Sequence, residues 1–284
     1  MAKAPTALPL FCNKPWVPEM RSKLKFLSLT MAGLTLACGQ ALAQTPPTPP
    51  KLTLDLVATH SALTAGLPNG NARNLRLVAD LSGGDSAQAE LLDERKFGLQ
   101  GGIVGVGYTR VLNPDWFASA NLALGHGGPN WAQRRLDGQL SRKWLARQQL
   151  VTSVAVYDAQ FDAGRSDRGV RLSASLYGDW PRLVEAGVLI NQSHPGGVRS
   201  NMPYLSAVFG QDGAQVFTLR VASGREAYQA LQTGTALVDF ASRSLGATGR
   251  FWLGPTWGLT AQAEAYHNPS YDRRSLGLGV FGQW

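Results

Sequence analysis

The last eleven residues, 274–284, constrain the fold more than any other stretch of the chain. Counting back in twos from the terminal tryptophan gives a glycine and then Val280, Leu278 and Leu276, and the positions between them are mostly small or polar. This alternation predicts a β-strand with one apolar face. In an outer-membrane barrel such a face meets lipid, and the last strand closes the ring against the first. An aromatic end resembles the signal that the barrel-assembly machinery reads, although Gly282 departs from the usual apolar residue there.

Residues 1–43 are predicted to be a leader whose core, residues 20–43, is a secretory signal peptide. A basic start precedes an apolar run at 26–37, which is too short to span a bilayer as a mature helix. The following Ala-Leu-Ala sequence predicts cleavage after Ala43. This signal directs the chain across the inner membrane of a Gram-negative cell.

Cysteine occurs only in this leader, at Cys12 and Cys38. Cys38 leaves a lipoprotein leader as an alternative, but a threonine replaces the usual apolar residue three positions earlier. Cleavage after Ala43 would leave no cysteine, which excludes disulfides and thiolate metal sites in the mature chain. It would also remove five basic residues and one acidic residue, so the formal charge of +8 falls by four to +4. We therefore expect no nucleic-acid partner.

The remaining chain is predicted to be a proline-rich linker at 44–50 followed by one barrel domain at 51–284. No run in this domain has the roughly twenty apolar residues of a spanning helix. Turn residues recur at all-β spacing. We count fourteen candidate strands, with twelve or sixteen as alternatives, at 51–62, 72–82, 86–96, 99–111, 116–127, 132–143, 149–161, 167–178, 182–193, 200–210, 214–226, 237–252, 257–267 and 274–284.

The connections between these strands alternate in length. Tight turns such as 83–85 alternate with connections that tend to be longer, of which 227–236 is the longest. Short periplasmic turns opposite longer outer loops are typical of outer-membrane barrels, and an even strand number places both ends of the barrel chain in the periplasm. The predicted fold is a single antiparallel, up-and-down transmembrane β-barrel, integral to the outer membrane and surrounded by its lipids.

Seven tryptophans remain after the predicted cleavage, and six fall at the tight-turn ends of predicted strands. Indoles favour the interface between membrane and water. The distribution predicts a periplasmic aromatic girdle of Trp116, Trp144, Trp180, Trp252, Trp257 and Trp284. Apolar plugs under the turns of a soluble sandwich are the alternative, but a sandwich gives no reason for the one-sidedness.

Six short motifs occur in order along the chain: ERKFG at 94–98, YTRVLNPDW at 108–116, HPGGVRS at 194–200, SGREAY at 223–228, GTALVDF at 234–240 and WLGPTWGL at 252–259. With the terminal strand, they resemble the YaiO-type outer-membrane β-barrel family over nearly all of the mature chain. The resemblance implies an outer-membrane barrel but no well-established activity. Some relatives resemble components of envelope or exopolysaccharide systems, which implies a role in envelope or biofilm biology.

The polar faces of the predicted strands carry both signs of charge. Charges that face lipid cost about 2–4 kcal/mol near the midplane, so inward placement is expected whatever the function. The residues predicted to face inward are Asp55, Arg76, Asp80, Glu90, Arg135, Asp137, Lys143, Arg171, Glu185, Arg220, Arg250 and Glu264. They form either a salt-bridged filling or the lining of a pore for polar solutes, and mixed charge indicates no strong ion preference.

The candidate site residues of the lumen or its mouth are Arg171, Glu185, Arg220, Arg225, Glu226, Arg250 and Glu264. Arg225 and Glu226 are predicted to open the longest outer loop. They either bind a ligand there or pin the loop through local hydrogen bonds, and arginine suits sugar-acid or phosphate groups.

Two kinds of chemistry have weaker support. The four histidines fall at outer strand ends without a metal-binding spacing, so neither a metal nor a cofactor is expected. An outer-membrane hydrolase needs a serine and a histidine on one face, and neighbours Ser193 and His194 point to opposite faces. His267 with Ser61, or His60 with Ser275, remain as pairs across the seam, but no G-x-S-x-G elbow marks a nucleophile.

The glycines at 101–107 precede more strand and no phosphate-binding lysine, so they fit bends in the wall better than a phosphate loop.

We therefore expect a non-enzymatic outer-membrane barrel for the passage or surface handling of polar solutes or envelope exopolysaccharide. The alternatives are a closed structural barrel that serves as a scaffold for an envelope complex, and an outer-membrane hydrolase. Expected partners are outer-membrane lipids, the barrel-assembly machinery through the terminal strand, and polysaccharide or other envelope proteins.

Overall fold

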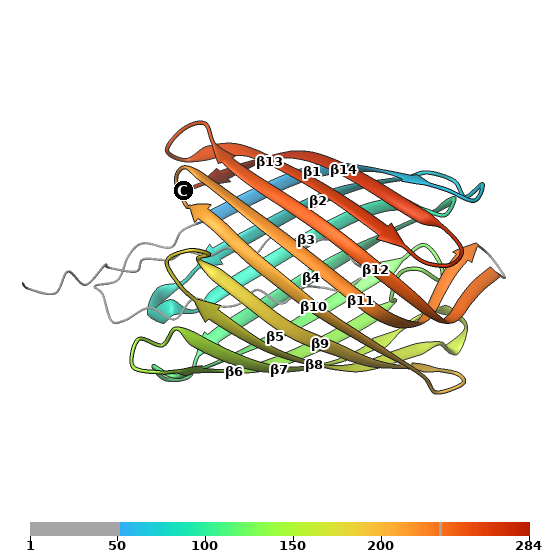
Figure 1. Ribbon diagram of the computed structural model, residues 1–284, viewed down its shortest axis with the longest axis horizontal. Coiled ribbons are helices and arrows are strands. Elements are labelled where there is room, and N and C mark those ends of the chain that lie inside the picture. Colours follow the sequence, from blue (N-terminus) through green and yellow to red (C-terminus); the bar gives the residue numbers. More distant parts are fainter. Residues whose placement is uncertain (1–51, 233–234) are drawn as a thin grey trace, which may run out of the picture.

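The structure is a computed structural model that describes residues 52–232 and 235–284. Within these residues, fourteen antiparallel strands form one closed barrel in which each strand pairs with its sequence neighbours and β1 pairs with β14 (Figure 1). The predicted fold class and the count of fourteen strands are confirmed. The predicted leader at 1–43 and linker at 44–50 lie outside the described residues. No helix in the described ranges is long and apolar enough to cross a membrane.

The strands are β1 (Leu52–Leu63), β2 (Gly70–Asp80), β3 (Ser86–Lys96), β4 (Leu99–Val111), β5 (Trp116–His126), β6 (Arg134–Trp144), β7 (Leu150–Gln160), β8 (Ser166–Tyr177), β9 (Leu183–His194), β10 (Val198–Gln211), β11 (Gln215–Gln232), β12 (Thr235–Trp252), β13 (Trp257–His267) and β14 (Asp272–Gln283). Two short 3-10 turns, η1 (Ser82–Gly84) and η2 (Asp162–Gly164), lie between strands. Most predicted bounds agree to within two residues, because the alternation that defines a strand ends where turn residues begin.

The seam between β1 and β14 closes the ring. Their pairing runs without a break from Thr53↔Gln283 to Leu63↔Arg273, and the hydroxyl oxygens of Ser61 and Ser275 lie 2.8 Å apart across it. A continuous seam leaves no unpaired strand edge, which is what a barrel in lipid requires.

The register separates an outer from an inner face. Leu276 and Leu278 of β14 are 70% and 74% exposed, whereas Thr53 of β1 and Thr260 of β13 are fully buried on the opposite face. The same alternation places all twelve charges expected to face inward on the inner face. The apolar outer face meets lipid and the inner face forms a polar lumen.

The outer end of the barrel differs from the sequence prediction. The predicted loop at 227–236 is wrong, because β11 continues to Gln232 and β12 begins at Thr235. This hairpin extension packs against connections from elsewhere on the rim through a buried cluster of Leu231, Phe97, Tyr266 and Tyr271. Long-range packing therefore keeps in strand form a polar segment whose composition indicates a loop.

Candidate functional site

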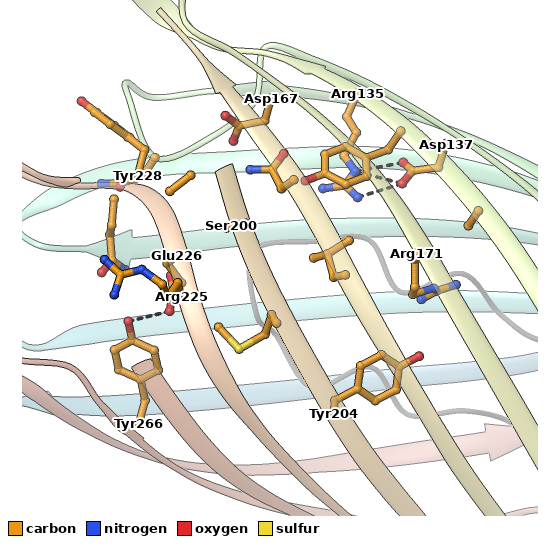
Figure 2. A pocket seen from close by; sticks show the side chains of 18 of the residues that line it. Arg135, Asp137, Asp167, Arg171, Ser200, Tyr204, Arg225, Glu226, Tyr228 and Tyr266 are labelled. Carbon is orange, nitrogen blue, oxygen red and sulfur yellow. Dashed lines mark hydrogen bonds and ion pairs between the residues drawn. The ribbon is translucent and has the colours of Figure 1, made fainter. Parts of the chain in front are cut away.

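A cavity of about 320 Å³ occupies part of the lumen (Figure 2). Inward-facing side chains of β6 to β11 supply most of its lining, and the connections β5–β6 and β7–β8 contribute at the outer end. The polar groups that dominate the lining are Arg135, Asp137, Arg171, Glu185, Tyr204 and Arg220. Arginines, carboxylates and phenols therefore converge on one enclosed space.

Arg135 and Asp137 form a complete ion pair on β6. They stand two residues apart, on the same face of the strand. The Nε and Nη2 atoms of Arg135 donate to the carboxylate of Asp137 at 2.8–3.1 Å, and its guanidinium lies 4.2 Å from the ring centre of Tyr157. The charges of this pair are mutually satisfied, so it shapes the wall more than it offers a free charge.

Glu185 is held by hydroxyl groups. Tyr204 Oη donates to it at 2.7 Å and Ser175 Oγ at 2.9 Å. The tyrosine ring lies over Gly187, where a Cβ atom would stand 2.6 Å from the ring. The guanidinium of Arg220 stacks on the ring of Tyr204, 3.9 Å from the ring centre.

Arg171 and Arg220 are the two cavity cations best placed to bind an anion. Arg171 donates to Gln139 Oε1 at 2.6 Å, and neither arginine forms an ion pair with a residue in the described ranges. The charged lining residues are Lys96, Arg135, Arg165, Arg171, Arg220, Arg225 and Arg273 against Asp137, Asp167, Glu185 and Glu226. Arg135, Arg225 and Arg273 are neutralised by Asp137, Asp239 and Glu264, so four cations remain against Asp167, Glu185 and Glu226. This leaves a positive excess of one charge in the cavity.

The predicted mouth residues, Arg225 and Glu226, have partners within the protein. Arg225 Nε donates to Asp239 Oδ1 at 2.9 Å, which joins β11 to β12. Tyr266 Oη donates to Glu226 at 2.8 Å (Figure 2). Both residues line the cavity, but they lie within strand β11. Their hydrogen bonds fit the alternative in which they hold this segment in place. Nearby, burial raises the pKa of Tyr271 to about 12, so its hydroxyl stays protonated.

Arg250 and Glu264 do not belong to the cavity lining. Arg250 is buried, pairs with Asp55 and lies 4.1 Å from the ring centre of Phe281. Glu264 accepts a hydrogen bond from Arg273 at 2.9 Å. These two predicted site residues therefore stabilise the wall between β12 and β1. They do not join Arg171 and Arg220 in the cavity lining.

Five of the six predicted girdle tryptophans lie on the outer side at the tight-turn end. Trp116 and Trp144 flank Arg142, whose guanidinium lies 5.3 and 3.7 Å from their ring centres, and Trp180 packs on Phe209. The exposed Trp257 and Trp284 continue the outward row of β13 and β14. Their role as a girdle remains a prediction.

The placement of Trp252 in that girdle is wrong. It shares the inward parity of Arg250 and pairs with Gly258, and its ring packs edge-on against the buried Phe281 at 4.8 Å. Its indole therefore fills the periplasmic end of the lumen.

The serine–histidine pairs considered for a hydrolase are separated by the barrel wall. Ser61 and Ser275 face the lumen, whereas His60 and His267 face outward, where His60 contacts Asn71 and His267 contacts Asp272. In the part of the chain that the structure describes, no group of three or more His, Cys, Asp or Glu side chains is arranged to hold a metal ion.

Tyr157 and Tyr204 are cavity residues that the sequence reasoning missed. Each ring lies over an inner-face glycine of a neighbouring strand, Gly169 of β8 for Tyr157 and Gly187 of β9 for Tyr204. A tyrosine on the inward parity beside a strand with an inward glycine is the signal that predicts such a contact.

Comparison with known proteins decides the family. A family model described as the YaiO membrane beta barrel domain matches residues 53–229, which is more than half of the chain. The chain belongs to the YaiO family. It is thus an integral β-barrel of the outer membrane, as the sequence predicted. The match runs from β1 into β11 and includes the strands that form most of the cavity lining of this YaiO barrel.

Several solved structures share the barrel architecture. They include the loop L8 deletion mutant of OmpT, an outer membrane protein of Vibrio cholerae (TM-score 0.49, 7% identity, 83% of this chain and 99% of that chain). Salmonella typhi OmpF in complex with daunomycin has a TM-score of 0.46 and 9% identity, and the match covers 83% of this chain and 97% of that chain. The translocator domain of the autotransporter NalP from Neisseria meningitidis has a TM-score of 0.42 and 12% identity, and the match covers 83% of this chain and 88% of that chain. No curated protein gave a match. Likenesses this weak say nothing about activity.

Proposed function

We propose that this YaiO barrel binds polar, saccharide-class solutes in its lumen cavity, for their passage across the outer membrane or their handling at the cell surface. The observation that carries the proposal is that Arg171 and Arg220, neither of which forms an ion pair with a described residue, face a cavity of about 320 Å³ beside Tyr204. A volume of this size lies at the lower end of small-molecule sites and fits a small sugar.

The charge of the lining favours an acidic saccharide. A guanidinium binds a carboxylate through two parallel hydrogen bonds, and such bonds are stronger than those between neutral groups. Tyr204 positions one of these arginines, because its ring stacks on the guanidinium of Arg220 while its hydroxyl donates to Glu185. Uronic acids, which are common in exopolysaccharides, combine a carboxylate with hydroxyls and a partly apolar ring.

A closed structural barrel is the second candidate, and a different observation favours it. Arg76 donates to Gln88, and Gln88 donates to Asn121 at 2.8 Å, which links β2, β3 and β5 across the inner wall. Such a network stiffens the barrel whether or not solute passes.

The test is single-channel recording with the full-chain protein in planar bilayers, with galacturonate or galactose added. A change in gel mobility on boiling first establishes that the barrel is folded. We expect openings that prefer anions and are blocked by galacturonate more strongly than by galactose. Arg171→Gln or Arg220→Gln should weaken this block about ten-fold, as expected for losing one charged hydrogen bond.

Arg110→Gln, on the outer face of β4, is the matched control and should leave the block unchanged. A folded barrel that stays silent and binds neither sugar would contradict the proposal and favour the structural barrel.

A further inference from the structure

The outward face of the barrel carries a row of arginines near one end. Along β2 the outward-facing apolar row ends at Leu75 and is followed by Arg73, and along β14 it ends at Leu276 and is followed by Arg274. β6, β8 and β12 show the same succession, in each case at the end opposite the tight turns. This is the extracellular end, because outer-membrane barrels have short turns in the periplasm.

Six exposed arginines at this level form no ion pair with a residue in the described ranges. We call them the arginine collar: Arg73, Arg95, Arg134, Arg199, Arg243 and Arg274. They lie on β2, β3, β6, β10, β12 and β14, so they encircle much of the barrel. Exposed, unpaired guanidiniums are free to bind anions from outside.

The acidic residues on the same face do not neutralise the collar. A seventh arginine, Arg168, pairs with Asp158 at 2.8 Å. Asp272 contacts His267 at 2.6 Å, and Asp93 accepts a hydrogen bond from Gln100. Seven arginines minus three aspartates leave +4 at this level.

The periplasmic end has a different composition. Within the described strands, the outward-facing arginines there are Arg110 and Arg142, and Arg142 is enclosed by the rings of Trp116 and Trp144. The two ends of the barrel therefore present different chemistry to the two membrane surfaces.

The position of the collar selects an amphipathic ligand. Guanidinium groups just outside an apolar band lie at the depth of lipid headgroups, where they bind phosphate through forked hydrogen bonds. The strongly exposed Leu276 and Leu278 lie directly below Arg274 on the same face and offer a surface for acyl chains. We propose that the arginine collar binds the phosphate groups of the phosphorylated glycolipid in the outer leaflet, with its acyl chains against the apolar band.

The test compares the binding of two lipids to the purified full-chain barrel in detergent by native mass spectrometry. One is bisphosphorylated lipid A and the other is the same lipid after enzymatic removal of both phosphates. The phosphorylated form should bind much more tightly. Arg199→Gln with Arg243→Gln should weaken its binding about 30-fold, from the contribution of two surface arginines near anionic lipid.

Arg110→Gln with Arg147→Gln is the matched control, since it removes two arginines at the periplasmic end and should leave lipid binding unchanged. Heat-modifiability establishes that each variant is folded. If the collar variant does not fold, Arg199→Lys with Arg243→Lys keeps the charge, loses the fork and should give an intermediate loss.

Equal binding of the two lipids, or an equal loss in the control, would overturn the proposal, because apolar contact alone would then explain retention. Inorganic pyrophosphate provides a separate arm. If it bound with the same dependence on Arg199 and Arg243 and the same affinity as the lipid, the collar would be a site for soluble anions.

Discussion

Inner-face glycines hold the long polar side chains of the neighbouring strands close to the wall. At Gly107 of β4, an added Cβ would stand 2.0 Å from Asn121 Oδ1 and 2.8 Å from Gln88 Nε2, two groups that hydrogen-bond to each other across the glycine. This contact links β3 to β5, which do not pair directly. The glycine is required here for space and not for its backbone conformation.

Gly107→Ala should therefore separate Gln88 from Asn121 and leave a buried amide without its partner. We expect a loss of about 1–3 kcal/mol in the free energy of unfolding, measured by tryptophan fluorescence in urea. Gly138→Ala is the control, since the nearest atom to its added Cβ is Val156 Cγ2 at 4.0 Å. Equal stability of the two variants would show that the contact across β4 is unimportant.

The pair Asp55 and Arg250 should show a different residue-scale effect. Asp55→Asn leaves the buried guanidinium of Arg250 without an anion, which typically costs about 3–5 kcal/mol. The double variant Asp55→Asn with Arg250→Gln should recover part of this loss, because no uncompensated charge remains. The same urea measurement distinguishes these cases. A double variant less stable than the single one would contradict this account.

At the scale of elements, strand positions follow from alternation, but strand ends that depend on distant contacts do not. The extension of β11 contains Ala230 and Leu231, two consecutive buried residues that break the period of two. Asp239 of β12 has a φ of 51°, which interrupts the partner strand. The packing of Leu231 in a cluster with Phe97 and Tyr271, both far away in the sequence, explains why this segment is not a loop.

The wrong placement of Trp252 in the girdle could have been avoided from the sequence alone. Its position at a strand end indicated an interfacial tryptophan. Its parity is that of Arg250, a residue already expected to face inward. Position along a strand gives depth, whereas parity gives the face, and a girdle residue needs both.

Leu231→Ala should loosen the hairpin extension without unfolding the barrel. It removes most of a buried side chain that contacts Phe97 and Tyr271, whereas Val238→Ala truncates an exposed side chain on the partner strand. We expect hydrogen exchange of β11 amides after Ala227 to accelerate about ten-fold or more in the first variant only. Similar protection in both would mean that the cluster does not hold the extension.

At the scale of the whole molecule, the sequence predicted which charges face the lumen but not which of them meet. Parity within each strand is sufficient to predict which charges face inward. Which charges meet depends on how fourteen tilted strands align around the ring, and this alignment brings together Asp55 and Arg250, 195 residues apart. The cavity arises in the same way, because Arg171 and Arg220 come from β8 and β11.

The orientation of the barrel can be tested with single cysteines, because the sequence contains none after residue 38. Ser270 lies in the exposed β13–β14 connection and Ala146 in the exposed β6–β7 turn, and the two test variants are Ser270→Cys and Ala146→Cys. A membrane-impermeant maleimide should label the first in intact cells and the second only after the outer membrane is permeabilised. The opposite pattern would reverse the assignment of the two ends.

The glycines beneath Tyr157 and Tyr204 have a consequence for the width of the lumen. These rings lie flat because Gly169 and Gly187 have no side chains, so residues without side chains determine how much of the cross-section stays open. A methyl group at either glycine would push a ring toward the axis and narrow the bore. A change at either glycine codon would therefore alter the open cross-section of the lumen, while the lipid-facing surface remains the same.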